Sequence, residues 1–174
     1  MQFPSKKQFE KNHPKFALIP DDDYSLKITK IEETKQKKYQ SQDDEDVFNI
    51  TLVVVCLKDG TEAIDEEGKP AEGRRVFFTA RPDSMGFSQD GMPSKTRSLV
   101  AYATDQDVYE EIELEAWEQL LGKQVNTHVI IKPNQKGERK NVIGRFLAPR
   151  MRKPKIDDDI PVIEEEEIPD NIPF

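Results

Sequence analysis

Hydrophobic and polar residues alternate along several stretches of this chain, which is the pattern of half-buried strands. The alternation is clear over Asp23 to Glu33 and over Arg74 to Arg81, and the run Val47 to Leu57 is rich in β-branched residues. Two further strands are predicted over Val125 to Lys132 and over Asn141 to Ala148. The sequence therefore predicts a mainly β body of five strands.

The segments between these strands predict loops and short helices. Thr34 to Asp46 is polar and mixed in charge, and we expect a mobile loop there. Ser94 can cap a helix of about Lys95 to Ala103, and a second helix fits Leu114 to Leu121, which Gly122 would end. Three strands, helical material and then two strands is the order of the OB-fold, a five-stranded Greek-key barrel. A five-strand sheet packed on a helix in another topology has the same order and stays open.

The third predicted strand has the most informative face in the body. Arg75, Phe77 and Arg81 share the face opposite to Val76 and Phe78. Arginine pairs with phosphates, and an aromatic ring stacks on a base for about 1–3 kcal/mol, so this face fits a strand of nucleic acid. The alternative interpretation is that Phe77 belongs to the core and that the arginines pair with nearby Glu residues.

Charge divides the chain into a balanced body and an acidic tail. Residues 157–174 contain eight Asp and Glu and no Lys or Arg; the other 26 acidic residues match the 26 basic ones. We expect the tail to be disordered, with its three Ile-Pro pairs favouring extended chain. The predicted organisation is a basic N-terminal arm (1–15), one domain (16–149), a basic linker (150–156) and the acidic tail (157–174).

The end of the tail, Pro169-Asp170-Asn171-Ile172-Pro173-Phe174, resembles the acidic tip of bacterial single-stranded DNA-binding proteins. In that family the tip docks replication and repair partners and, when free, competes with DNA for the protein's own binding surface. Asn171 stands where the family has Asp. The alternative is an acidic tail kept for solubility. The resemblance implies that the residues binding replication or recombination proteins are Asp170, Ile172, Pro173 and Phe174.

The body carries a second resemblance, one of pattern, over about residues 16 to 149. The opening Phe16 to Tyr24 (FALIPDDDY), the turn Leu121-Gly122-Lys123 and a basic hairpin before the last strand are similar to phage-encoded OB-fold single-stranded DNA-binding proteins. In that family DNA lies on the barrel face and the flanking loops. The resemblance maps the DNA-binding residues onto Lys35, Lys37, Lys38, Tyr39, Arg75, Phe77, Arg81, Lys136, Arg139, Lys140 and Arg145.

No convincing catalytic or metal-binding motif is present in the sequence, so we expect no enzyme, no cofactor and no metal. Gly86 to Met92 begins like a P-loop, but Met92 stands where the phosphate-binding Lys must be. The acidic run Asp43 to Asp46 cannot surround an ion alone, and His128 has no second ligand at metal spacing. Cys56 is the only cysteine. Neither a long apolar run nor a signal-peptide pattern occurs, which favours a cytoplasmic protein, in the host cytoplasm if phage-encoded.

These features predict a sequence-independent single-stranded DNA-binding protein. It would coat exposed strands in replication, recombination or repair and recruit partners through its tail. The alternative is a protein-binding adaptor or DNA mimic whose barrel does not bind nucleic acid, and a third hypothesis is an enzyme of nucleic-acid metabolism. The sequence is compatible with a homo-oligomer and leaves the choice between DNA and RNA open.

Overall fold

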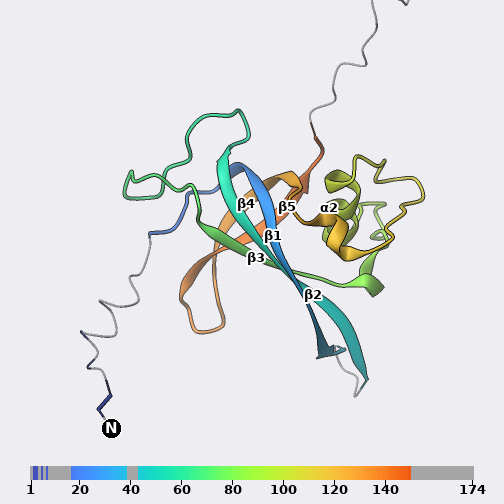
Figure 1. The fold of residues 1–174 in the computed structure, drawn as a ribbon, viewed down its shortest axis with the longest axis horizontal. Helices are drawn as coiled ribbons and strands as arrows, with labels where there is room; N and C mark the ends of the chain where they lie inside the picture. The colour runs from blue at the N-terminus through green and yellow to red at the C-terminus, as the bar shows by residue number, and fades with distance from the viewer. Residues whose placement is uncertain (1, 4, 6, 8–16, 39–42, 150–174) are drawn as a thin grey trace, which may run out of the picture.

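One antiparallel sheet dominates the computed structural model, which describes residues 2, 3, 5, 7, 17–38 and 43–149 (Figure 1). Its strand order is β3-β2-β1-β4-β5. The prediction of a mainly β body with five strands is confirmed. The strands are β1 (Asp22–Lys37), β2 (Asp44–Leu57), β3 (Arg75–Ala80), β4 (Gln124–Pro133) and β5 (Arg139–Leu147).

Helical structure is confined to the chain between β3 and β4. The helix α2 (Lys95–Ala103) begins as predicted, with the Ser94 hydroxyl accepting a hydrogen bond from the Arg97 N–H at 3.1 Å. The predicted second helix is wrong: only a 3-10 turn, η2 (Trp117–Leu120), forms there. The following turn is tied to the sheet, because the Gly122 N–H donates to the Ile28 carbonyl at 2.8 Å. A further 3-10 turn, η1, spans Pro82–Ser84. Within the described ranges, no helix combines the length and apolar character needed to span a membrane.

The strands β1 and β2 form a longer hairpin than the sequence predicted. The expected mobile loop over residues 34–46 is wrong, because the ladder continues to the pair Lys37 and Asp44. Opposite charges face each other there, and Lys35 Nζ lies 3.8 Å from Asp46 Oδ1. Cross-strand pairs of opposite charge stabilise the extended ladder. The mixed charge of this stretch therefore indicates paired strands rather than a loop.

The core lies between the inner face of the sheet and α2. Leu26, Leu52 and Leu99 are fully buried within it. Trp117 stacks on Phe48 with ring centroids 4.4 Å apart, and both rings pack against this core. Bulges in β1 let it pair with both β2 and β4, so one bent strand joins the two halves of the sheet.

The N-terminal end of β1 is fixed by a buried tyrosine. The Tyr24 hydroxyl donates to the Pro20 carbonyl at 2.7 Å. Burial, with smaller contributions from the charges of Asp22 and Asp21, raises the pKa of Tyr24 to about 12. The hydroxyl is therefore a neutral hydrogen-bond donor at neutral pH, and it holds the chain before β1 against the body.

The two edge strands of the sheet, β3 and β5, approach each other through side chains. The rings of Phe78 and Phe146 meet edge to face, with centroids 5.1 Å apart. No backbone ladder joins β3 to β5 among the residues described. The chain before β1 is attached to β5, because the Asn141 side-chain amide accepts from the Ile19 N–H at 3.1 Å and donates to the Ile19 carbonyl at 2.8 Å.

Candidate nucleic-acid interface

Phe77 lies on the outer face of the sheet, not in the core. Its side chain is 68% exposed, whereas Phe78 packs against the core. The register places Lys30 of β1, Thr51 of β2 and Phe77 of β3 in one row across the strands. The alternation along β3 thus predicted correctly which face carries the ring, and the alternative that Phe77 is a core residue is wrong.

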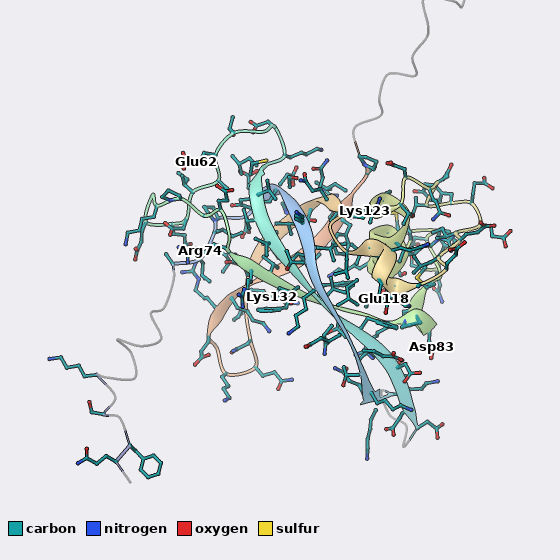
Figure 2. The ribbon with its side chains drawn as sticks, in the orientation of Figure 1. Glu62, Arg74, Asp83, Glu118, Lys123 and Lys132 are labelled. Carbon is teal, nitrogen blue, oxygen red and sulfur yellow. The ribbon has the colours of Figure 1, made fainter. Side chains whose placement is uncertain are left out.

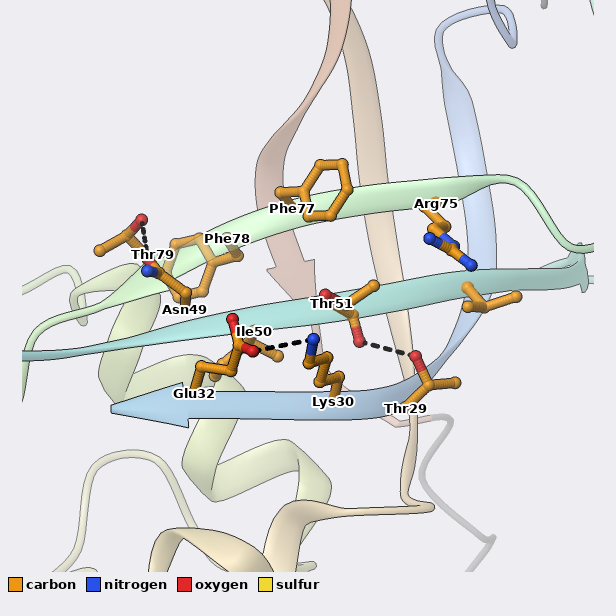
Figure 3. A pocket seen from close by; sticks show the side chains of 11 residues that line it. Thr29, Lys30, Glu32, Asn49, Ile50, Thr51, Arg75, Phe77, Phe78 and Thr79 are labelled. Carbon is orange, nitrogen blue, oxygen red and sulfur yellow. Dashed lines mark hydrogen bonds and ion pairs between the residues drawn. The ribbon is translucent and has the colours of Figure 1, made fainter. Parts of the chain in front are cut away.

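A first hollow of about 750 Å³ lies on this outer face, with polar side chains around the ring of Phe77 (Figure 3). The Thr79 hydroxyl donates to the Asn49 side-chain oxygen at 3.2 Å, and Lys30 pairs with Glu32 at 2.8 Å. Hydroxyl and amide groups can donate and accept hydrogen bonds without requiring one particular base. The lining residues are Thr29, Lys30, Glu32, Asn49, Ile50, Thr51, Val53, Arg75, Phe77, Phe78 and Thr79.

Two further hollows continue from the first, and we call all three together the track. The second, of about 670 Å³, shares Arg75 and Phe77 with the first and reaches Leu18 and Lys140. The third, of about 570 Å³, shares Lys140 with the second and follows the β4–β5 hairpin past Lys136. Because neighbouring hollows share residues, the track is continuous from the β1–β2 face across β3 to the β4–β5 hairpin.

Exposed cations line the track. Arg75, Lys132, Lys136 and Lys140 are exposed, and none of them forms an ion pair with another described residue. The carboxylate of Glu138 also lines the third hollow, so the surface is basic on balance rather than uniformly. A long concave surface with unpaired cations and one exposed ring suits a chain of phosphates carrying planar groups.

A buried carboxylate holds the loop that forms one wall of the track. Asp65, which is buried, accepts hydrogen bonds from the backbone N–H groups of Glu67 at 2.9 Å and Lys69 at 3.0 Å. Its other oxygen accepts from Arg74 Nη2 at 2.9 Å. Because Gly73 and Arg74 line the second hollow, Asp65 fixes that wall from behind.

Four of the predicted DNA-binding cations are engaged in ion pairs outside the track. Arg81 pairs with the largely buried Glu45, and its backbone N–H donates to the Thr96 hydroxyl at 3.1 Å. The alternative that the arginines pair with Glu therefore holds for Arg81 and not for Arg75. The pairs of the other three are Lys35–Asp46 at 3.8 Å, Lys38–Asp83 at 3.5 Å and Arg139–Glu66 at 2.9 Å.

The remaining predicted residues are separate from the track or outside the described residues. Arg145 lies on β5 across from His128, whose Nδ1 is 2.7 Å from Asp23 Oδ1. Lys37 ends β1 opposite Asp44. Tyr39, the basic linker (150–156) and the tail with Asp170, Ile172, Pro173 and Phe174 fall outside the described residues, as does most of the N-terminal arm.

Sequence reasoning missed the polar lining of the track. Thr29, Asn49 and Thr51 were not singled out, because only the strand register shows that they surround Phe77. The alternation along β2 was the available signal, since it placed Asn49 and Thr51 on the outward face. Across the described ranges, no three His, Cys, Asp or Glu side chains come together where they could hold a metal ion.

Comparison of the chain with models of protein families finds no match, and comparison with curated proteins finds none either. Function therefore has to be inferred from the residues and geometry of this chain. The track, with Phe77 and Arg75 at the junction of its first two hollows, is the feature from which that inference starts.

Proposed function

We propose that this chain is a single-stranded DNA-binding protein that coats exposed strands without sequence specificity in replication or recombination. The observation that carries the proposal is the exposed ring of Phe77 beside Arg75, on a track along which Arg75, Lys132, Lys136 and Lys140 form no ion pair with another described residue. A ring accepts any base by stacking, and the cations follow the phosphates. Duplex DNA hides its base faces, so the exposed ring favours a single strand.

The architecture supports an OB-fold for this body. The strand order β3-β2-β1-β4-β5 with α2 between β3 and β4 is that of an OB barrel, and the Phe78–Phe146 contact brings the two sheet edges together. OB-folds bind oligonucleotides on the face of strands 2 and 3 and on the loops beside it, including the loop between strands 4 and 5. The track occupies the same places.

The tail completes the proposed function. Its ending Asp170 to Phe174 would bind replication or recombination proteins, and its eight acidic residues would compete with DNA for the cations of the track. Deleting residues 157–174 should therefore tighten single-strand binding at low salt. The gain should shrink as salt is added, because salt screens the competing charges.

The test is a titration of labelled oligothymidine at two salt concentrations, with the full chain and with the chain lacking residues 157–174. If Arg75, Lys132, Lys136 and Lys140 all contact phosphates, the log–log slope of affinity against salt should be about −3, at about −0.7 per contact. The double variant Arg75→Ala/Lys140→Ala should reduce that slope by about 1.4. The matched control, Lys58→Ala/Lys123→Ala, removes two exposed lysines outside the track and should leave the slope unchanged.

Each of the other outcomes rejects part of the proposal. Absence of binding at low salt would favour the adaptor or DNA-mimic hypothesis. Metal-dependent cleavage of the same oligonucleotide would indicate an enzyme. Equal affinity at low salt with and without the tail would reject competition by the tail while leaving DNA binding in place.

A further inference from the structure

A second group of exposed rings lies on the side of the molecule that carries α2. Phe87, in the loop between η1 and α2, stacks on Tyr109, in the loop between α2 and η2. Their ring centroids are 6.1 Å apart with an interplanar angle of 11°. Phe87 is 45% exposed, and Tyr109 and Met92 are each 63% exposed. We call Phe87, Met92 and Tyr109 the aromatic platform.

Arg97 of α2 fixes the platform in place. Its guanidinium carbon lies 4.4 Å from the centroid of the Phe87 ring. The same group donates to the carbonyls of Val108 at 2.6 Å and of Met85 at 3.0 Å, and also to the carbonyl of Glu110. One side chain therefore ties together the two loops that carry the rings. A ligand would meet rings that are already ordered, which lowers the entropic cost of binding.

Acidic residues dominate the segment that carries Tyr109. Between Thr104 and Gly122 the chain has seven acidic residues and no Lys or Arg. This acidic rim would repel the phosphates of a nucleic acid and attract cations, and an exposed ring binds Lys or Arg through its face. The members of the rim are Asp105, Asp107, Glu110, Glu111, Glu113, Glu115 and Glu118.

The described chain ends close to this surface. Pro149 and Tyr102 of α2 line the same small cavity of about 120 Å³. Tyr102 lies five residues after Arg97 on α2, about 7.5 Å along the helix axis, and Arg97 holds the platform. Pro149 therefore lies against the helix that supports the platform. In Figure 1 the chain leaves the body beside α2.

The segment that follows Pro149 has the complementary charge. Residues 150–155, which we call the basic run, lie outside the described residues and read RMRKPK, with four cations and no acid. Six extended residues reach about 20 Å. That length exceeds the rise of about 7.5 Å along α2 from Tyr102 back to Arg97, the residue that holds the platform.

We propose that the basic run docks on the aromatic platform and acidic rim of its own chain. Its cations would lie against the exposed ring of Tyr109 and against the carboxylates of the rim. This contact would anchor the start of the acidic tail on the α2 side, away from the track. The proposal does not depend on DNA binding, because it rests on the platform, the charge of the rim and the position of Pro149.

Carbodiimide cross-linking of the full chain at low protein concentration and low salt tests the proposal, because the reagent joins a lysine amine to a carboxylate already in contact with it. Cross-linked peptides from the monomer are identified by mass spectrometry. Lys153 and Lys155 should be joined to the rim. Cross-links to the four other rim carboxylates should become weaker in the variant Glu110→Gln/Glu111→Gln/Glu113→Gln, because the remaining charge holds the run less tightly. They should persist in the matched control Glu62→Gln/Glu67→Gln/Glu72→Gln, which removes three exposed carboxylates from the loop between β2 and β3.

Two cross-linking outcomes would overturn the proposal. Cross-links from the basic run spread equally over the rim and the β2–β3 loop would show a segment without a fixed site. Cross-links to the rim found only in dimers would show that the occupant is the run of a second copy. Links to the adjacent residues 157–159 are ignored, because neighbours in sequence meet whether or not the run docks.

Amide NMR spectra provide a second measurement that needs no change in the rim. The full chain is compared with the variant Arg150→Gln/Arg152→Gln/Lys153→Gln/Lys155→Gln. Chemical-shift changes should be concentrated in residues 85–93 and 105–116, and added salt should produce the same changes in the unmodified chain. Shifts confined to the substituted residues and their neighbours in sequence would reject the docking.

Discussion

The track and the aromatic platform both expose rings, but their charges are opposite. Phe77 stands beside Arg75 and Lys140, which form no ion pair with another described residue, whereas Tyr109 of the platform lies in a segment with seven acidic residues and no Lys or Arg. In Figure 2 labelled side chains of both signs occur on each side of the view, with Arg74 and Glu62 to the left and Lys123, Glu118 and Asp83 to the right, so the contrast is local to the two surfaces. The neighbouring charges, not the ring, indicate which partner each surface can take. One side suits a polyanion and the other a basic peptide.

The two surfaces are also supported in opposite ways. Behind the track, the buried carboxylate of Asp65 accepts hydrogen bonds from two backbone N–H groups and from the Arg74 guanidinium. Behind the platform, the guanidinium of Arg97 donates hydrogen bonds to backbone carbonyls. In each case the supporting charge has the sign opposite to that of the exposed surface. Removing one support at a time therefore tests whether the two regions are independent.

Asp65→Ala should have the largest effect on stability. It removes a buried carboxylate that accepts from Arg74 Nη2 and from two backbone N–H groups, and breaking a buried pair in this way costs about 3–5 kcal/mol. Urea denaturation measures the loss in the free energy of unfolding. Glu67→Ala, at an exposed position in the same loop, should change that free energy by no more than about 0.5 kcal/mol. Equal losses in the two variants would show that Asp65 is not the support of this loop.

Phe77→Ala should weaken single-strand binding and leave the fold intact. Losing one ring–base stack costs about 1–3 kcal/mol, which is about 5- to 150-fold in the dissociation constant for oligothymidine. Because the ring is exposed, the free energy of unfolding should change by about 0.5 kcal/mol or less. Leu121→Ala removes an apolar side chain that is 44% exposed outside the track, and it should leave the affinity unchanged. Unchanged affinity of Phe77→Ala would place the DNA elsewhere.

The outward face of β3 could be predicted because strand alternation depends only on neighbouring residues. The ion pairs could not, since Arg81 meets Glu45 across 36 positions and Arg139 meets Glu66 across 73. Both arginines look available in the sequence, and only the packed structure shows that they are engaged. The track could not be predicted for the same reason. It brings together segments near residues 18, 75 and 140, which are far apart in the sequence and which no local pattern connects.

The helical region shows a second limit of local patterns. The prediction for α2 was correct at both ends, because Ser94 provides a cap that can be recognised from sequence alone. Leu114 to Leu121 has a helical stripe as well, yet only four residues form a 3-10 turn. There Leu120 and Trp117 are held by the core, and Gly122 is bonded to β1, so tertiary contacts determine the backbone.

Arg97→Lys should loosen the platform without affecting the track. An ammonium cannot reproduce a planar guanidinium that faces a ring and donates to several carbonyls at once, and we expect a loss of about 1–2 kcal/mol in the free energy of unfolding. Hydrogen exchange should increase in residues 85–93 and 105–113 and stay unchanged in the loop held by Asp65. Lys123→Arg, the reverse exchange at an exposed position, is the control and should leave hydrogen exchange in both loops unchanged. Faster exchange in both loops would mean that the two surfaces are not independent.

The smallest expected effect concerns the titration of Tyr102, which reports the electrostatic field of the acidic rim. Its pKa is raised by burial and by nearby Tyr109 and Asp107, because a negative neighbour disfavours the phenolate. As pH rises, the unfolded chain loses the Tyr102 hydroxyl proton at about pH 10, whereas the folded protein keeps it to higher pH. The contribution of Tyr102 to the free energy of unfolding is therefore complete below about pH 10 and falls as pH rises through the pKa of Tyr102 in the folded state. Asp107→Asn should lower the pKa of Tyr102, and its side-chain oxygen can still accept the hydrogen bond from the Tyr109 N–H.

NMR of the tyrosine ring signals against pH measures the shift of Tyr102. Asp90→Asn, at an exposed position in the loop that carries Phe87, is the matched control and should leave the pKa of Tyr102 unchanged. The fourfold Gln variant of the basic run should raise that pKa further, because cations held near Tyr102 favour its phenolate. An identical titration with and without the cations of the run would mean that they do not lie beside Tyr102, and the proposed anchor of the tail would then be wrong.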